Sequence, residues 1–378
     1  MEQAANTIMA YGTFWALVPP LVAIILALVS KEVYSSLFVG VVVGGLLLCQ
    51  GSGSGFFDAI FKNGLIAKVA DPYNVGILLF LVMLGAMVAL MNRAGGSAAF
   101  GNWAKNHIKS KVGVQIATIC FGILIFIDDY FNCLTVGSVM RPVTDRYKVS
   151  HEKLAYLIDS TAAPICIIAP ISSWAAAVSG FVEGEDGLTL FIKAIPFNFY
   201  ALLTILTLFL VVVWNVNIGP MKKYESLENF VDANVDSVKS ADAKGGVLDL
   251  VMPIASLIVF CVLGMVYTGG FFASGDAAKG FVDAFASCDA SVGLAIGSFG
   301  AFIFTVCFYM SRRVLRFNHC MACLPDGFKA MVPAILILAL AWTLKGTTDA
   351  LGAKLKVRLV LRRMCACLLA KERLACTI

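Results

Sequence analysis

Long apolar runs, interrupted by short polar segments, fill most of this chain. Each run is close to the roughly 20 residues that cross a bilayer as a helix, and none alternates as a barrel strand does. We expect membrane spans at Phe14–Val29, Val33–Cys49, Asn74–Met91, Ala194–Val213, Leu250–Tyr267, Ser291–Met310 and Ala330–Leu344. With the interrupted segments below, the pattern predicts an all-α polytopic membrane protein of about nine to ten transmembrane or re-entrant helices.

The polar segments predict how these helices are threaded. Phe56–Ala70 carries scattered charges on an apolar background and is typical of an interfacial amphipathic helix. Arg93–Lys111 is basic without an acidic residue, and Arg141–Lys153 is a second basic segment, so both are expected on the cytoplasmic side. The apolar run Val112–Met140 between them then enters and returns as a re-entrant hairpin, with its tip near Asp128–Asn132.

Two adjacent carboxylates lie at that tip. An ionised Asp at the centre of a bilayer costs about 2.5–3.5 kcal/mol, so such residues usually line an ion path. On a helix, Asp128, Asn132 and Thr135 share one face at i, i+4 and i+7, and Asp129 meets Asn132 at i+3. The pair is predicted to hold either a proton or Na⁺. The alternative is structural, with the carboxylates stabilised by the positive end of the following helix.

A second interrupted helix is expected between Lys153 and Gly180, where Pro164 and Pro170 each disfavour helix in the preceding residue. We expect its middle to carry Asp159, Ser160 and Thr161, with freed backbone carbonyls that suit a hard cation. Together these features predict a Na⁺ site at Asp128, Asp129 and Asp159.

The distribution of apolar residues predicts two hydrophobic halves, 1–216 and 250–353. A polar linker at 217–249, which we expect to be solvated, joins them. The segment Gly55–Phe61 resembles Gly280–Phe285, which predicts duplicated halves. Thr347, Thr348 and Asp349 then form the second tip. Charge orients both halves alike, whereas such repeats are commonly inverted, and the sequence leaves that choice open.

The last segment, 354–378, differs in composition from the rest of the chain, with many basic residues and neither Gly nor Pro. One interpretation is a basic amphipathic helix at the membrane surface. The interpretation we prefer is an aberrant end, frame-shifted or truncated, that replaces the last helices of the second half.

Composition excludes several classes of function. The chain is 60% hydrophobic and 14% charged, against about 25% charged residues in globular proteins. The net charge of +5 comes mostly from 354–378, so we expect no nucleic-acid partner. With three His and no phosphate-binding or catalytic-triad motif, we expect neither an enzyme nor a cofactor. The 12 Cys are scattered in apolar runs, as small buried hydrophobes are.

Four motifs between Gly122 and Trp174 carry a resemblance to a known family: Phe126–Asn132, Gly137–Asp145, Glu152–Pro164 and Pro170–Trp174. They resemble the NhaC-type sodium/proton antiporters of the wider ion-transporter superfamily. The resemblance implies exchange of external protons for internal Na⁺ across the bacterial cytoplasmic membrane, in a multi-pass protein of the cell membrane. The implied partners are the lipid bilayer, Na⁺ and H⁺, with a homodimer left open.

Two other functions stay open from the sequence. The same fold could carry a small carboxylate or amino acid with Na⁺, held by the hydroxyls of Ser160, Thr161, Ser172 and Ser173 at helix N-termini. Alternatively, the chain is a truncated product that transports nothing.

Overall fold

A computed structural model describes residues 11–49, 53–126, 129–170, 172, 174–175, 187–217, 219–226, 245–273 and 279–353. Every regular element in this part of the chain is a helix, which confirms the all-α prediction. The chain forms two compact units, residues 1–75 with 332–378 and residues 76–331. The predicted halves follow the chain order instead, and they stay a prediction.

The first unit holds the N-terminal helices and the end of α18. They are η1 (Phe14–Leu17), α2 (Val18–Ser30), α3 (Val33–Cys49), α4 (Gly53–Phe57), the π-helical η2 (Asp58–Ile66), α5 (Ala67–Val69) and the last part of α18 (Phe317–Ala350). Glycines set their spacing, because a Cβ on Gly40 would lie 2.8 Å from Ala23 Cβ and one on Gly44 would lie 2.9 Å from Thr347 Oγ1. Small residues therefore let α3 approach its neighbours closely.

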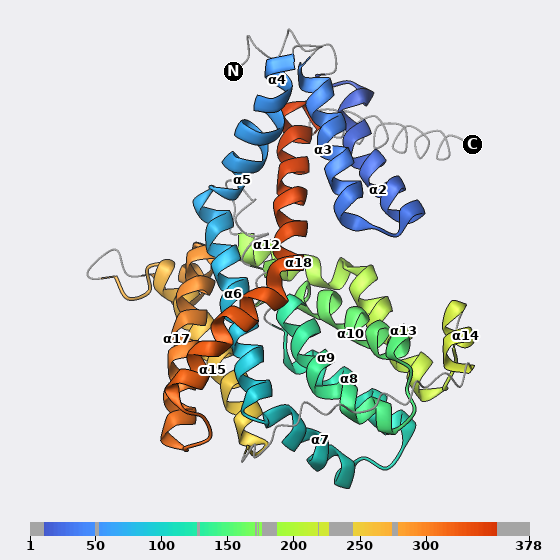
Figure 1. Ribbon diagram of the computed structural model, residues 1–378, viewed down its shortest axis with the longest axis vertical. Helices are drawn as coiled ribbons and strands as arrows, with labels where there is room; N and C mark the ends of the chain where they lie inside the picture. The colour runs from blue at the N-terminus through green and yellow to red at the C-terminus, as the bar shows by residue number, and fades with distance from the viewer. Residues whose placement is uncertain are drawn as a thin grey trace, which may run out of the picture. The chain divides into compact units, whose positions relative to one another are not determined.

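The second unit holds the longest apolar helices (Figure 1). Its elements are α6 (Pro72–Arg93), α7 (Gly96–His107), α8 (Lys111–Leu124), α9 (Asp129–Arg146), α10 (His151–Cys166), α12 (Gly187–Ala194), η3 (Ile195–Phe197), α13 (Phe199–Val213), α14 (Pro220–Ser226), α15 (Leu248–Thr268), α16 (Phe281–Ala286), α17 (Ala290–Ser311) and the first part of α18. In the described residues, four helices (α6, α15, α17 and α18) are long and apolar enough to span a membrane, or five if one bent pair counts as a span. Three further apolar helices are shorter. The chain is a multi-pass membrane protein.

Helices α15 and α17 pack through glycine. A Cβ on Gly297 would lie 2.5 Å from Cys261 Cα, and one on Gly293 would lie 2.8 Å from Met265 Cα. Gly293 and Gly297 are four residues apart on one face of α17, a spacing that lets two helix backbones approach closely. In a bilayer the hydrophobic effect does not draw helices together, so this close packing stabilises their association.

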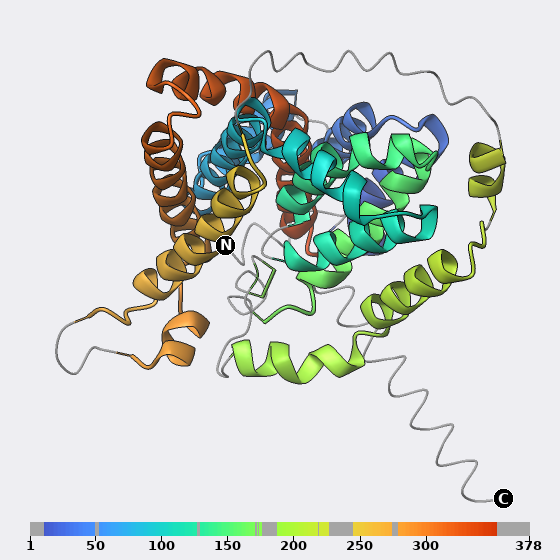
Figure 2. The same cartoon turned by 90° about the horizontal axis from the view of Figure 1, so that it is seen from below.

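The expected span Ala194–Val213 is wrong as a single helix. Thr189–Phe197 and Phe199–Val213 meet at an angle of 51°, a bend visible in Figure 2. Pro196 lies in the short 3₁₀ helix η3, and the Asn198 side chain caps α13 by accepting from Ala201 N at 3.2 Å. A local cap and a proline therefore restart the helix inside a run that hydropathy treats as uniform.

The expected end of helix at Leu344 is also wrong, because α18 continues to Ala350. Thr347 and Thr348 fit inside it, since both hydroxyls donate to Leu344 O, at 2.8 and 2.6 Å. The turn comes at Gly352, whose φ of +73° suits glycine.

Part of the predicted solvated linker is packed. Helix α14 lies within it, and Asn217 Oδ1 accepts from Lys153 Nζ at 2.5 Å. Asp249 at its other edge is fully buried and pairs with Arg312 at 2.7 Å. Residues 227–244 and the predicted aberrant tail 354–378 lie outside the described residues.

Candidate functional site

The candidate site lies where α8 ends and α9 begins. Ser110 caps the start of α8 by accepting from Gly113 N at 2.9 Å, and the helix ends at Leu124. Helix α9 starts at Asp129, so the chain turns at the predicted tip. The break precedes Asp129, however, and Asp129–Asn132 forms the first turn of a regular helix. Whether this hairpin is re-entrant in a bilayer stays a prediction.

Asn132 joins the two helices. Its side chain is fully buried, and Nδ2 donates to Gly122 O at 2.6 Å and to Ile125 O at 2.8 Å. The amide therefore satisfies carbonyls at the end of α8 that have no partner further along the helix. Both N–H groups are used in this way, and the oxygen Oδ1 is left buried without a hydrogen-bond partner.

Thr135 adds a second oxygen, one turn further along α9. Its side chain is fully buried, and Oγ1 has no hydrogen-bond partner. A buried threonine in a helix usually donates to the carbonyl three or four residues before it, as Thr144 does to Met140 O. An unpaired buried polar atom is costly, so this pair of oxygens is suited to a ligand that accepts lone pairs.

Asp129 lies one turn before Asn132 and is half-buried. Its carboxylate accepts from Tyr130 N at 3.1 Å and from the side chain of Trp174. Asp129 meets Asn132 at i+3, as expected, and Thr135 follows Asn132 by another three residues. The position of Asp129 in the first turn of α9 also suits the capping alternative. Asp128, the other predicted carboxylate, lies outside the described residues.

Helix α10 contributes Thr161 but not Asp159. A Cβ on Gly122 would lie 2.6 Å from Thr161 Oγ1, so Thr161 packs against the same glycine whose carbonyl Asn132 caps. Asp159 precedes Thr161 by two residues, and two residues turn a helix by about 200°. The Asp159 side chain therefore lies on the opposite side of α10 from Thr161, where it is exposed. The exposure of Asp159, away from the Thr161 face of α10, argues against its part in the predicted three-carboxylate Na⁺ site. In the described residues, no three His, Cys, Asp or Glu side chains are placed to hold a metal.

The predicted interruption between Lys153 and Gly180 is present, because α10 ends at Cys166 and non-helical residues follow it, but it does not fall at Asp159–Thr161. Asp159, Ser160 and Thr161 lie inside regular helix, and Thr161 donates to Leu157 O and Ile158 O at 2.9 Å. Although Pro164 lacks the N–H that would bond Ser160 O, α10 continues to Cys166.

Ser172 satisfies the end of α10. It is fully buried and donates to Cys166 O at 2.7 Å and to Ala169 O at 3.0 Å, while Ala175 N donates to it at 3.1 Å. A hydroxyl used in this way is not available to hold a substrate carboxylate. Ser173, its expected companion, lies outside the described residues.

The second predicted tip lies in the first compact unit, whereas the α8–α9 break lies in the second. Thr347 and Thr348 bond within α18, and Thr347 packs against Gly44. Asp349 is half-buried near the end of the same helix. Within their own unit, Thr347 and Thr348 therefore serve helix packing.

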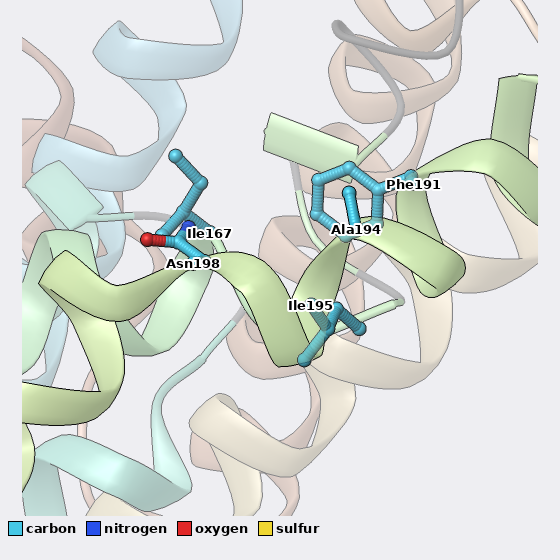
Figure 3. Close-up of a pocket in the computed structure, with 5 residues that line it drawn as sticks. All are labelled: Ile167, Phe191, Ala194, Ile195 and Asn198. Carbon is cyan, nitrogen blue, oxygen red and sulfur yellow. The ribbon is translucent and has the colours of Figure 1, made fainter. Parts of the chain in front are cut away.

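A separate cavity of about 190 Å³ lies beside the bend between η3 and α13 (Figure 3). It is lined by Ile167, Phe191, Ala194, Ile195 and Asn198. The lining is apolar apart from Asn198, whose oxygen already caps α13. Among the side chains that line this cavity, Asn198 supplies the only oxygen.

The sequence does not point to two residues that build the site. Gly122 supplies the carbonyl for Asn132 and the space for Thr161, and Trp174 reaches Asp129 from beyond the end of α10. Gly122 and Trp174 are the first and last residues of the stretch that carries the family resemblance. That resemblance is the one sequence signal that could have identified them as site residues.

Comparisons with known proteins support a transporter. Residues 182–362 match the sequence profile of the Na⁺/H⁺ antiporter family, a family of transporters rather than enzymes. The chain is 34% identical over 349 residues, 88% of its length, to an uncharacterized protein of Haemophilus influenzae. It spans 66% of that protein, just under two thirds. No solved structure matches it. The profile match supports a sodium/proton antiporter-type transporter.

Proposed function

We propose that this protein is a secondary active transporter of the NhaC type, exchanging Na⁺ for H⁺ across the bacterial cytoplasmic membrane. One observation carries the proposal. Asn132 Oδ1 and Thr135 Oγ1 are buried and unpaired, one turn apart on α9, and the carboxylate of Asp129 lies one turn before Asn132. Na⁺ prefers oxygen ligands, and a helix break at a buried position is where transporters commonly bind it.

The mechanism rests on competition at Asp129. The ionised carboxylate and the two neutral oxygens bind Na⁺, and the C-terminal end of the α8 dipole adds negative potential. A proton that binds the carboxylate removes its charge and releases Na⁺. If the site opens to one side of the membrane at a time, each cycle carries Na⁺ one way and protons the other.

The profile match to Na⁺/H⁺ antiporters supports the same class of transport from a different stretch of chain. It covers residues 182–362, whereas the α8–α9 site lies between residues 111 and 146.

The test is exchange in proteoliposomes carrying the full chain. We expect Asp129→Asn to reduce Na⁺-driven proton flux to the level of empty liposomes, because the amide neither titrates nor carries charge. Asp159→Asn is the matched control, since that carboxylate is exposed on α10. Exchange that survives Asp129→Asn, or an equal loss in both variants, contradicts the proposal.

A further inference from the structure

Gln115 on α8 has a buried side-chain oxygen that the proposed site does not use. The side chain is 1% exposed, and Nε2 donates to Lys111 O at 3.2 Å, while Oε1 has no hydrogen-bond partner. In the part of the chain that the structure describes, two other buried side-chain N or O atoms lack a hydrogen-bond partner, and they belong to Asn132 and Thr135. All three therefore lie on the α8–α9 hairpin.

The register of the hairpin relates Gln115 to the site. Asn132 binds carbonyls at the end of α8, and the chain reverses between Leu124 and Asp129, so the two helices run antiparallel. Gln115 precedes Gly122 by seven residues, which places it on the same face of α8 and about 10 Å away along the axis. Thr118, also fully buried, lies between them on that face.

The chemistry of the free atoms selects the ligand. The unpaired atom is the amide oxygen Oε1, which accepts hydrogen bonds or coordinates cations, while Nε2 donates within α8. An unpaired acceptor does not match an anion, which needs a donor. Lys111 and the positive end of α8 lie one turn away and weaken the binding of any cation, bare or hydrated. A weakly held cation keeps part of its water, and that water presents O–H groups to an acceptor oxygen.

We propose that Gln115 Oε1 forms a second binding position, for partly hydrated Na⁺, on the route between the Asp129 site and the Lys111 end of α8. This inference rests on the proposed function and assigns the side from which the site is reached along the hairpin. Thr118 lines the route between the two positions.

Sidedness of the Na⁺ dependence tests this route. In proteoliposomes of the full chain, Gln115→Met keeps the length of the side chain and removes the oxygen. We expect the half-saturating Na⁺ concentration to rise about tenfold on one face of the membrane, as for the loss of one neutral oxygen, and to stay unchanged on the other. A folding defect lowers transport from both faces alike, and Gln115→Glu, which keeps an acceptor oxygen, should restore Na⁺ affinity.

The outcomes separate this inference from the proposed function. If Asp129→Asn abolishes exchange and Gln115→Met leaves both faces unchanged or alters them equally, Gln115 holds a structural water only and the second position is overturned. If Asp129→Asn retains exchange, the proposed function itself fails.

Discussion

At the scale of single residues, Thr135 offers a test that separates binding from stability. Thr135→Val keeps the shape of the side chain and removes a buried oxygen that has no partner. We expect the free energy of unfolding to stay the same or to rise by about 1 kcal/mol, because an unpaired polar atom is lost. Na⁺ affinity in proteoliposomes should fall about tenfold, because the same atom is a ligand.

The matched control is Thr305→Val on α17. Thr305 is equally buried, but its hydroxyl donates to Ala301 O at 2.8 Å. We expect no change in Na⁺ affinity from this variant. Thermal unfolding in detergent gives the stability of both. A Thr135→Val protein that is destabilised and binds Na⁺ normally would show that this oxygen is structural.

Part of the site follows from residue spacing and part does not. The i+3 spacing of Asp129 with Asn132 depends only on helical periodicity, so the sequence predicts it, whereas the predicted face of Asp128, Asn132 and Thr135 includes a residue outside the described part of the chain. Periodicity also places Asp159 and Thr161 on opposite sides of α10, and the prediction that joined them relied on a break that α10 does not have. The contact of Trp174 with Asp129 depends on tertiary folding, which spacing does not reveal.

At the scale of helices, close approach is set by glycine. Gly297→Ala places a Cβ about 2.5 Å from Cys261 Cα, and that backbone atom cannot rotate away. We expect the free energy of unfolding to fall by about 1–3 kcal/mol as α15 and α17 separate. Thermal unfolding in detergent measures the loss.

Gly137 provides the contrasting substitution. Among the described residues, a Cβ there would meet only Ile158 Cδ1, at 3.7 Å, so Gly137→Ala on α9 should be neutral or stabilising by about 0.5–1 kcal/mol. Equal losses in both variants would show that glycine flexibility, rather than helix packing, matters at these positions.

The sequence predicts which segments are helical better than where helices break. The runs at Val33–Cys49, Leu250–Tyr267 and Ser291–Met310 match α3, α15 and α17 closely, because uniform hydropathy over that length leaves few alternatives. Breaks depend on single caps, such as Asn198, and on whether neighbours tolerate a proline, as they do at Pro164. Hydropathy does not record either.

At the scale of the whole molecule, the sequence predicts a polytopic membrane protein but not which polar residues tie its helices together. Asp249 falls at the edge of a segment expected to be solvated, yet it is fully buried at the start of α15. Its carboxylate accepts from Gly246 N and from Arg312, both at 2.7 Å, and its carbonyl accepts from Tyr309 at 2.5 Å. The ion pair with Arg312, at the C-terminal end of α17, explains how the Asp249 carboxylate can be buried.

This tie yields the last prediction. Arg312→Gln leaves a buried carboxylate without its cation, and we expect a loss of about 3 kcal/mol, near the lower bound for a buried pair because Arg312 is 37% exposed. Asp326→Asn is the control, since its pair with Arg93 at 3.9 Å joins exposed side chains and should contribute less than about 1 kcal/mol. Adding Asp249→Asn to Arg312→Gln should recover stability, because the uncompensated charge is gone. Additive losses in that double variant would mean that the two side chains act independently and that glycine packing alone holds α15 against α17.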